Sequence, residues 1–172
     1  PSINYRSIGI NAATLYDVGD ATIGSGTTTV TFGSGASLPA NVGAGDRLVI
    51  GAETFFILSR DSATQVTVQT AAATGHSGDA YAITRAYNTF QSWEDDRDGD
   101  LVGENRTEVG VAYDDGDFVA ASNPLLGIDG SITDATRYLW VTVGPGQRHN
   151  GTAGTGVVLD GVYSTQFGFD LK

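Results

Sequence analysis

The sequence predicts an all-β protein: a small antiparallel barrel or sandwich, one short helix, and then a second β-sheet or rudimentary β-helix. Short runs rich in Thr, Val and Ile recur at spacings of ~8–16 residues in the first half. Gly supplies 24 of 172 residues, well above its usual share of ~7%, which suits a chain with many tight turns. A single segment near residue 90 repeats its apolar side chains at helical intervals.

The first module is expected to span residues 1–84, with an N-terminal strand ahead of a small barrel or sandwich. Ala21–Phe32 contains two strand-like runs around Gly24-Ser25-Gly26, which indicates a hairpin. The residues that follow alternate short apolar runs with Gly, Asp and Ser turns, and His76 is expected in a loop over 75–78. Further strands are predicted over residues 47–50, 53–58, 65–70 and 80–84.

One helix is predicted after this module. Thr84 is the expected N-cap, and Tyr87, Phe90 and Trp93 form one aromatic stripe at steps of three residues. Such a stripe is far more often core than a ligand-binding feature, so the helix should lie on a sheet or close a barrel end. Gly99 can end it with a left-handed residue.

The second module, residues 85–172, is expected to return to strands after the helix. Alternation places Val109, Val111 and Tyr113 on one face of a strand. The predicted strands cover residues 107–113, 136–143, 155–160 and 162–169.

Composition disfavours several classes of partner. Nine Lys and Arg against 20 Asp and Glu give a net charge of −11, which opposes binding to nucleic acid and to anionic membranes. No apolar run approaches the ~20 residues needed to span a bilayer, and no signal peptide is visible. The absence of Cys excludes disulfides and thiolate metal sites.

Specific motifs of the chain resemble those of bacteriophage virion proteins. The first set is Gly45-Asp46, Phe55-Phe56-Ile57, Ser59–Val68 and Tyr81-Ala82-Ile83, which resembles a small barrel module of such proteins. The second set is Ala86–Trp93, Glu108–Tyr113 and Arg137–Pro145, which is similar to the helix-capped start of right-handed parallel β-helix proteins, including phage tailspikes and pectate-lyase-like proteins. About 75 residues follow the helix, room for roughly three coils at ~20–29 residues each.

The densest acidic segment is the candidate metal site. Acids alternate through Asp96, Asp98 and Asp100 around Gly99, a pattern typical of calcium loops. Aligning Gly99 to the sixth loop position puts Glu94 first and Asn105 twelfth, where Asp and Glu are expected. The alternative is a solvated helix end, and no other cofactor is expected.

No catalytic residue is predicted. His76 and His149 lie far apart in polar turns, and no nucleophile-elbow motif is present. A glycosidase pair of carboxylates cannot be assigned among twenty acids. Tyr138 and Trp140 could stack on sugars, although they flank Leu139 in a strand that should bury at least one face.

The resemblance implies a non-enzymatic structural protein of a virion, either a phage tail component or a capsid-decorating protein. We expect it to form a homo-oligomer, with a trimer as the first expectation, because open sheet edges need cover. Other virion proteins and a cell-surface glycan are the remaining expected partners, in a virion or extracellular location. The alternatives are a strand-exchanged filament with Ile3–Ile10 as donor strand, part of a polysaccharide-binding or polysaccharide-processing β-helix protein, and a calcium-stabilised surface protein.

Overall fold

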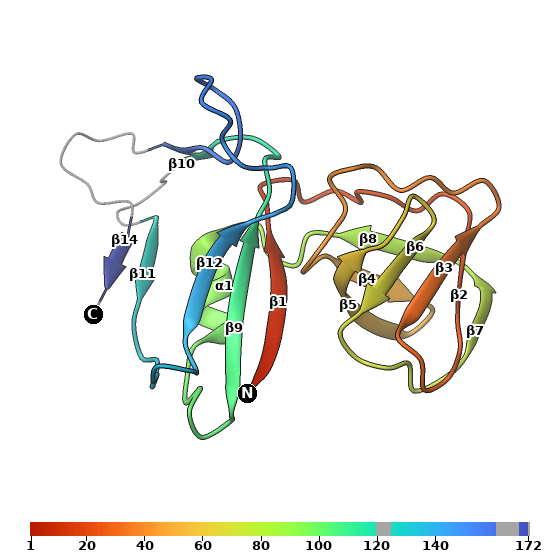
Figure 1. Ribbon diagram of the computed structural model, residues 1–172, viewed down its shortest axis with the longest axis horizontal. Helices are drawn as coiled ribbons and strands as arrows, with labels where there is room; N and C mark the ends of the chain where they lie inside the picture. Colours follow the sequence, from red (N-terminus) through yellow and green to blue (C-terminus); the bar gives the residue numbers. More distant parts are fainter. Residues whose placement is uncertain (120–124, 161–168, 172) are drawn as a thin grey trace.

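The computed structural model describes residues 1–119, 125–160 and 169–171, which form strands and one short helix (Figure 1). The chain builds a curled antiparallel half-barrel and, beside it, a set of parallel strands with the helix packed behind them. The predicted all-β fold class is therefore confirmed. We call the first part the barrel module and the second the coil module.

The barrel module is one seven-stranded antiparallel sheet in the order β7-β2-β3-β6-β5-β4-β8. Alternating side chains of every strand except β7 point inward, and the buried set includes Val30, Phe32, Leu48, Ile57, Val66 and Val68. Its strands are β2 (Asp20–Ile23), β3 (Thr29–Gly33), β4 (Arg47–Ile50), β5 (Glu53–Arg60), β6 (Gln65–Val68), β7 (His76–Asp79) and β8 (Tyr81–Thr84).

The predicted strands of this module fall close to the observed ones, with one exception. A loop was expected where β7 lies, since the sequence His76-Ser77-Gly78-Asp79 shows no alternation of apolar side chains. It pairs with β2, with Asp79 opposite Ala21 and His76 opposite Ile23, across an irregular register. Pairing with an existing sheet edge, rather than intrinsic preference, makes this polar segment a strand.

The coil module is built from parallel ladders. β9 (Arg106–Ala112) pairs with both β1 (Ser2–Ile8) and β12 (Leu139–Val143). β10 (Phe118–Val119) pairs with β13 (Leu159–Asp160), and β11 (Leu126–Ile128) pairs with β14 (Phe169–Leu171). The strands β9, β10 and β11 thus form one coil of the chain, and β12, β13 and β14 form the next. Each strand of the first coil pairs in parallel with the corresponding strand of the second. This is the coil arrangement of a rudimentary β-helix; the predicted strand over 162–169 lies almost wholly outside the described residues.

The N-terminal strand belongs to the coil module and not to the barrel. β1 was expected within the module of residues 1–84, and the filament alternative used Ile3–Ile10 as a donor strand, but β1 pairs along its whole length with β9 of its own chain. Ile8 is fully buried beside Ala112 in the core of the coils. β9 is the central strand of this sheet: it forms hydrogen bonds with β12 along one edge and with β1 along the other.

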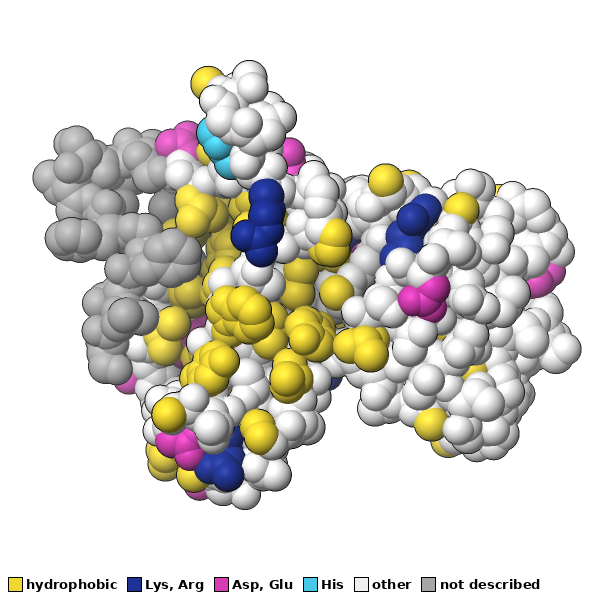
Figure 2. Space-filling view, viewed as in Figure 1, with side chains coloured by type: hydrophobic (Ala, Val, Ile, Leu, Met, Phe, Trp, Pro, Cys, Tyr) yellow, Lys and Arg dark blue, Asp and Glu magenta, His cyan; other side chains and the backbone are white. Residues whose placement is uncertain are grey.

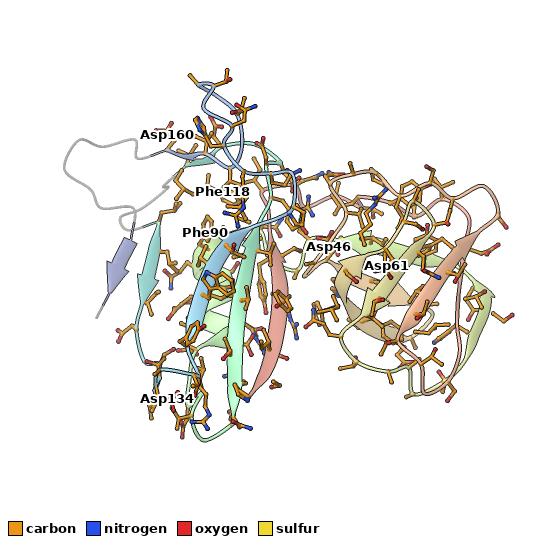
Figure 3. All side chains as sticks on the ribbon, viewed as in Figure 1. Asp46, Asp61, Phe90, Phe118, Asp134 and Asp160 are labelled. Carbon is orange, nitrogen blue, oxygen red and sulfur yellow. The ribbon has the colours of Figure 1, made fainter. Side chains whose placement is uncertain are left out.

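The helix α1 (Phe90–Arg97) starts five residues later than predicted. Its N-cap is Thr89, whose hydroxyl oxygen accepts from the backbone N–H of Ser92 at 3.0 Å, while Thr84 still belongs to β8. The aromatic stripe is core, as predicted: Phe90 and Trp93 are buried in the coil module (Figure 3 labels Phe90). Gly99 follows the C-cap with φ +108°, which confirms its predicted role as helix stop.

Gly110 on β9 lets the helix approach the sheet closely. A Cβ at this position would lie 2.8 Å from Ile8 Cδ1 and 3.0–3.1 Å from the indole of Trp93. The indole therefore occupies the space that any larger residue at 110 would need, and the helix packs directly on the sheet backbone.

A buried carboxylate also fastens the helix to β9. Glu108 is fully buried and accepts from Arg97 Nε at 2.9 Å and from Arg97 Nη2 at 2.7 Å. Arg106 Nη1 donates to it at 2.9 Å and Asn4 Nδ2 at 2.7 Å. Burial alone would raise the pKa of Glu108, but these hydrogen bonds hold the pKa below its ordinary value. The charge is thus shared among three elements: β1, α1 and β9.

The two modules meet at a second buried charge network. Arg85 Nη1 donates to Asp46 Oδ1 at 2.8 Å, and Arg85 Nε and Nη2 donate to the two oxygens of Asp115 at 2.7 and 2.8 Å. The guanidinium lies 3.8 Å from the ring centroid of Tyr113, whose hydroxyl donates to the backbone oxygen of Ala44 at 2.9 Å. Asp46 lies where the modules meet (Figure 3), and burial raises its pKa to about 6.

We expect Arg85→Met to destabilise the fold by about 3–5 kcal/mol, because it leaves two buried carboxylates without a cation. Urea unfolding followed by circular dichroism measures the change. Arg137→Met is the matched control: its pair with Asp134 is partly exposed and should be worth within about 1 kcal/mol. Equal losses in the two variants would contradict the central role of Arg85.

Candidate functional site: the open end and outer face of the coils

One end of the coil module is closed by the barrel module, through the free edge of β1. Gln69 acts there in place of a strand: its Oε1 accepts from Tyr5 N at 3.0 Å, and its Nε2 donates to Tyr5 O at 2.9 Å. Ser7 N donates to Gly45 O at 2.8 Å, and Ser7 O accepts from Tyr87 N at 3.0 Å. No further strand can pair at this edge without displacing these contacts.

The helix closes the same end at β11. The side-chain amide of Gln91 takes the place of a neighbouring strand here. Its Oε1 accepts from Gly127 N at 2.8 Å, and its Nε2 donates to Gly127 O at 3.3 Å. Glu94 Oε1 accepts from Asp129 N at 3.0 Å. Burial of the Glu94 carboxyl raises its pKa above the ordinary value. Two side chains of α1 thus satisfy the backbone edge that a preceding coil would occupy.

At the other end of the coils, β12 has β9 as its only strand partner among the described residues. Glu108 N donates to Tyr138 O, and Gly144 N donates to Ala112 O, so even-numbered residues of this strand face β9. Strand alternation directs the backbone groups of Leu139, Val141 and Val143 away from β9. Within residues 1–119, 125–160 and 169–171, neither a strand nor a side chain pairs with these groups. We call this edge the open edge.

The face of the β1-β9-β12 sheet turned away from α1, here the outer face, carries exposed aromatic side chains. Tyr138 and Trp140 are 42% and 49% exposed, and Ile3 on β1 is 51% exposed. Register aligns Trp140 with the buried Val109 of β9. Figure 2 shows hydrophobic side chains gathered over these strands.

The outer face carries no charge along the three strands. Its residues, in rows across the sheet, are Ile3, Thr107 and Tyr138; Tyr5, Val109 and Trp140; and Ser7, Val111 and Thr142. Leu139, between the two aromatics, packs instead with the buried core behind the sheet. The expectation that one face of this strand is core is confirmed, and the two aromatic rings lie on the other face.

The acidic segment does not gather its predicted ligands. Asp96 accepts a hydrogen bond from the Tyr87 hydroxyl. Asp98 is the helix C-cap, and Asp100 Oδ1 accepts from Gly103 N at 2.7 Å. Over the part of the chain that the structure describes, no three His, Cys, Asp or Glu side chains are arranged to hold a metal ion. Calcium binding stays a prediction from sequence, and the geometry adds no support to it.

A shallow polar hollow lies beside the helix, on the side where α1 contacts β11. Its carboxylates are those of Glu94, Asp95, Asp98 and Asp129. Asp129 was missed by sequence reasoning because it comes from a distant turn and has no local signal. Glu94 serves the closure of β11, so the hollow holds structural groups of the cap.

His76 lies between two carboxylates of the barrel module. Its Nδ1 is 2.8 Å from Asp79 Oδ2, and its Nε2 is 3.3 Å from Glu53 Oε2. The hydrogen bond with Asp79, with that of Glu53 added, raises the pKa of His76 above its ordinary 6.5. Nε2 thus joins β7 to β5, whereas Nδ1 is engaged within β7. His149 lies in an exposed turn, where Nδ1 accepts from Gly151 N at 3.0 Å.

Comparison with known proteins gives no relative. No family model, curated protein or solved structure matches the chain. Among the described residues no helix is long and apolar enough to cross a membrane. The candidate site is an uncharged outer face that ends at the open edge of β12.

His76→Gln should destabilise the fold more at about pH 5.5 than at about pH 8.5. A raised folded-state pKa contributes stability below the unfolded pKa of 6.5, and this stability is lost as pH rises through the folded pKa. Urea unfolding at the two pH values measures the difference. His149→Gln is the control, and a pH-independent loss for His76→Gln would show that the ion pairs contribute nothing.

Proposed function

We propose that the chain is a non-enzymatic structural component of a virion, either in a phage tail or as a capsid decoration. It self-associates and binds neighbouring virion proteins outside the cell. Under this proposal its surfaces serve contact and shape, and its buried ionisable groups serve the fold.

The asymmetry of the coil module carries this proposal. Gln69, Gln91 and Glu94 satisfy the backbone at one end, whereas at the other end no described residue pairs with the outward-facing backbone of Leu139, Val141 and Val143. A protein that works alone normally protects such an edge with charge, Pro or a covering segment. An unprotected edge beside an uncharged apolar face suits a subunit that is covered in an assembly.

The pairing of the buried and strand-joining ionisable groups within the fold also supports a structural role. Arg85 and Glu108 are paired inside the fold, and His76 joins β7 to β5 through Glu53. Each is engaged by partners from its own chain. These groups therefore have a complete structural account without a substrate.

Particles purified from the culture that produces the chain should contain it in fixed proportion to the major coat protein. Mass spectrometry across a density gradient, after nuclease and high-salt washing, measures this ratio. Fractions of host cytosol serve as the control. If the chain sediments only with soluble protein, the virion assignment is wrong.

The exposed aromatic pair favours a second candidate function, which is binding of a neutral cell-surface glycan. Tyr138 and Trp140 alternate with the inward Leu139, so both rings lie on the outer face of one strand. Sugar rings present C–H faces that stack on such rings, and an uncharged surface suits a neutral chain. This function belongs to the alternative that the chain is part of a polysaccharide-binding protein.

If the glycan function holds, Trp140→Ala should weaken binding up to about tenfold, the range for loss of one aromatic contact. A glycan array followed by titration calorimetry on any positive ligand measures the effect. Ile132→Ala is the control, because Ile132 is similarly exposed, at 57%, but lies outside the outer face. An array without a positive glycan would contradict this second function.

A further inference from the structure

We infer that Asn150 is a site of self-modification, at which the side-chain amide is converted to a carboxylate through a succinimide formed with the backbone nitrogen of Gly151, with His149 as the general base. The reaction belongs to the loop between β12 and β13, which extends away from the sheets (Figure 1). It is independent of the proposed function.

The loop is held by contacts between its two sides. Val157 N donates to Gln147 O at 3.1 Å, and a Cβ on Gly156 would lie only 2.4 Å from His149 N. His149, Asn150 and Gly151 are nevertheless exposed. Water therefore reaches the reacting atoms, while the backbone on either side of them is fixed.

The residue pair at this position is the one that closes a succinimide ring most readily. Asn150 is the only Asn of the sequence that precedes a Gly. Because Gly has no Cβ, its nitrogen can approach the preceding side-chain amide carbon without steric obstruction. Gly151 also has φ +94°, a conformation that other residues rarely adopt. The turn and the attack thus both require Gly at position 151.

His149 is placed to take the proton of the attacking nitrogen. Its Nδ1 accepts from Gly151 N at 3.0 Å, so the neutral ring carries its proton on Nε2 and a lone pair on Nδ1. An amide nitrogen becomes nucleophilic only as it loses its proton, and a general base must lie within hydrogen-bond distance of that proton. His149 meets this requirement before the reaction starts.

The carbonyl under attack is held by hydrogen-bond donors. Thr152 N donates to Asn150 Oδ1 at 3.0 Å, and the Thr155 hydroxyl lies 2.9 Å from the same oxygen. This hydroxyl is also 2.7 Å from Thr152 O, but a developing oxyanion is the stronger acceptor for its proton. The two donors therefore stabilise the negative charge of the tetrahedral intermediate. Among the described residues nothing binds Asn150 Nδ2, the leaving group.

The atoms and protons of the reaction balance. Gly151 N gives its proton to His149 and bonds to Asn150 Cγ. The Cγ–Nδ2 bond then breaks, and the proton leaves with Nδ2 as ammonia. Water opens the succinimide at either carbonyl, which gives aspartate or isoaspartate. The loop gains one negative charge, and in the isoaspartate form also one backbone methylene.

Incubation of the purified folded chain at neutral pH should convert Asn150. Peptide mapping by mass spectrometry detects the succinimide by the loss of one ammonia, and the products by the replacement of NH2 with OH. Asn11 is the control within the same chain. It is exposed and its Oδ1 accepts from Ala13 N at 2.9 Å in the same kind of turn, but Ala12 follows it and its nitrogen meets no imidazole.

His149→Gln should slow the conversion about tenfold. Gln keeps a polar side chain but cannot take the proton, and the loss stays below the usual ~10²–10⁴-fold of a general base because water can act in its place. Repeating both measurements in urea shows whether the folded loop matters: the wild type should react more slowly there than when folded, and the difference between wild type and variant should disappear.

Two results would overturn the assignment. Equal rates for the wild type and His149→Gln in the folded state would remove the imidazole from the reaction. A folded chain that converts Asn150 no faster than the chain in urea, or no faster than Asn11, would show that the loop protects the amide and does not activate it.

Discussion

The arrangement of this protein depends on one guanidinium. Arg85 follows the last barrel strand directly, and its side chain, 1% exposed, binds Asp46 of the barrel module and Asp115 of the coil module. A charge removed from water needs its partners in place, so the network admits few relative positions of the modules. In the observed position, Gly45, next to Asp46, meets the backbone of β1. The closed end of the coils follows from this contact.

Both closures use the same chemical device, in which a side-chain amide or carboxylate replaces the backbone of a missing strand. Gln69 serves β1, while Gln91 and Glu94 serve β11. A side chain forms hydrogen bonds with the backbone groups of the edge strand, but it presents no further row of backbone groups. The hydrogen-bonded ladder of strands therefore ends there. The closed end therefore ends the ladder, and β12 is the strand from which pairing can continue.

The sequence predicts what is local in this fold. Alternation located the barrel strands, such as the run containing Val66 and Val68, and helical spacing identified Phe90 and Trp93 as core. Thr84 and Thr89 are equally good capping residues by type, and only the pairing of β8 with β4 decides between them.

What the sequence does not predict is non-local. The partner of β1 lies about a hundred residues away at β9, and no local pattern encodes that choice. The same is true of the candidate site: Trp140 is visible in the sequence, but the closure of the opposite edges by Gln69 and Gln91 depends on contacts with residues far away along the chain.

The distribution of charge, more than its amount, sets the candidate site apart from the rest of the surface. A net charge of −11 makes any two copies repel at long range, and the repulsion is weakest where a surface carries no ionised group. The outer face and the open edge are such a surface, whereas Glu94, Glu108 and Asp115 are held in the cap of the coils and in the buried ion pairs. The charged groups that fix the fold therefore lie outside β12, which itself contains no charged residue.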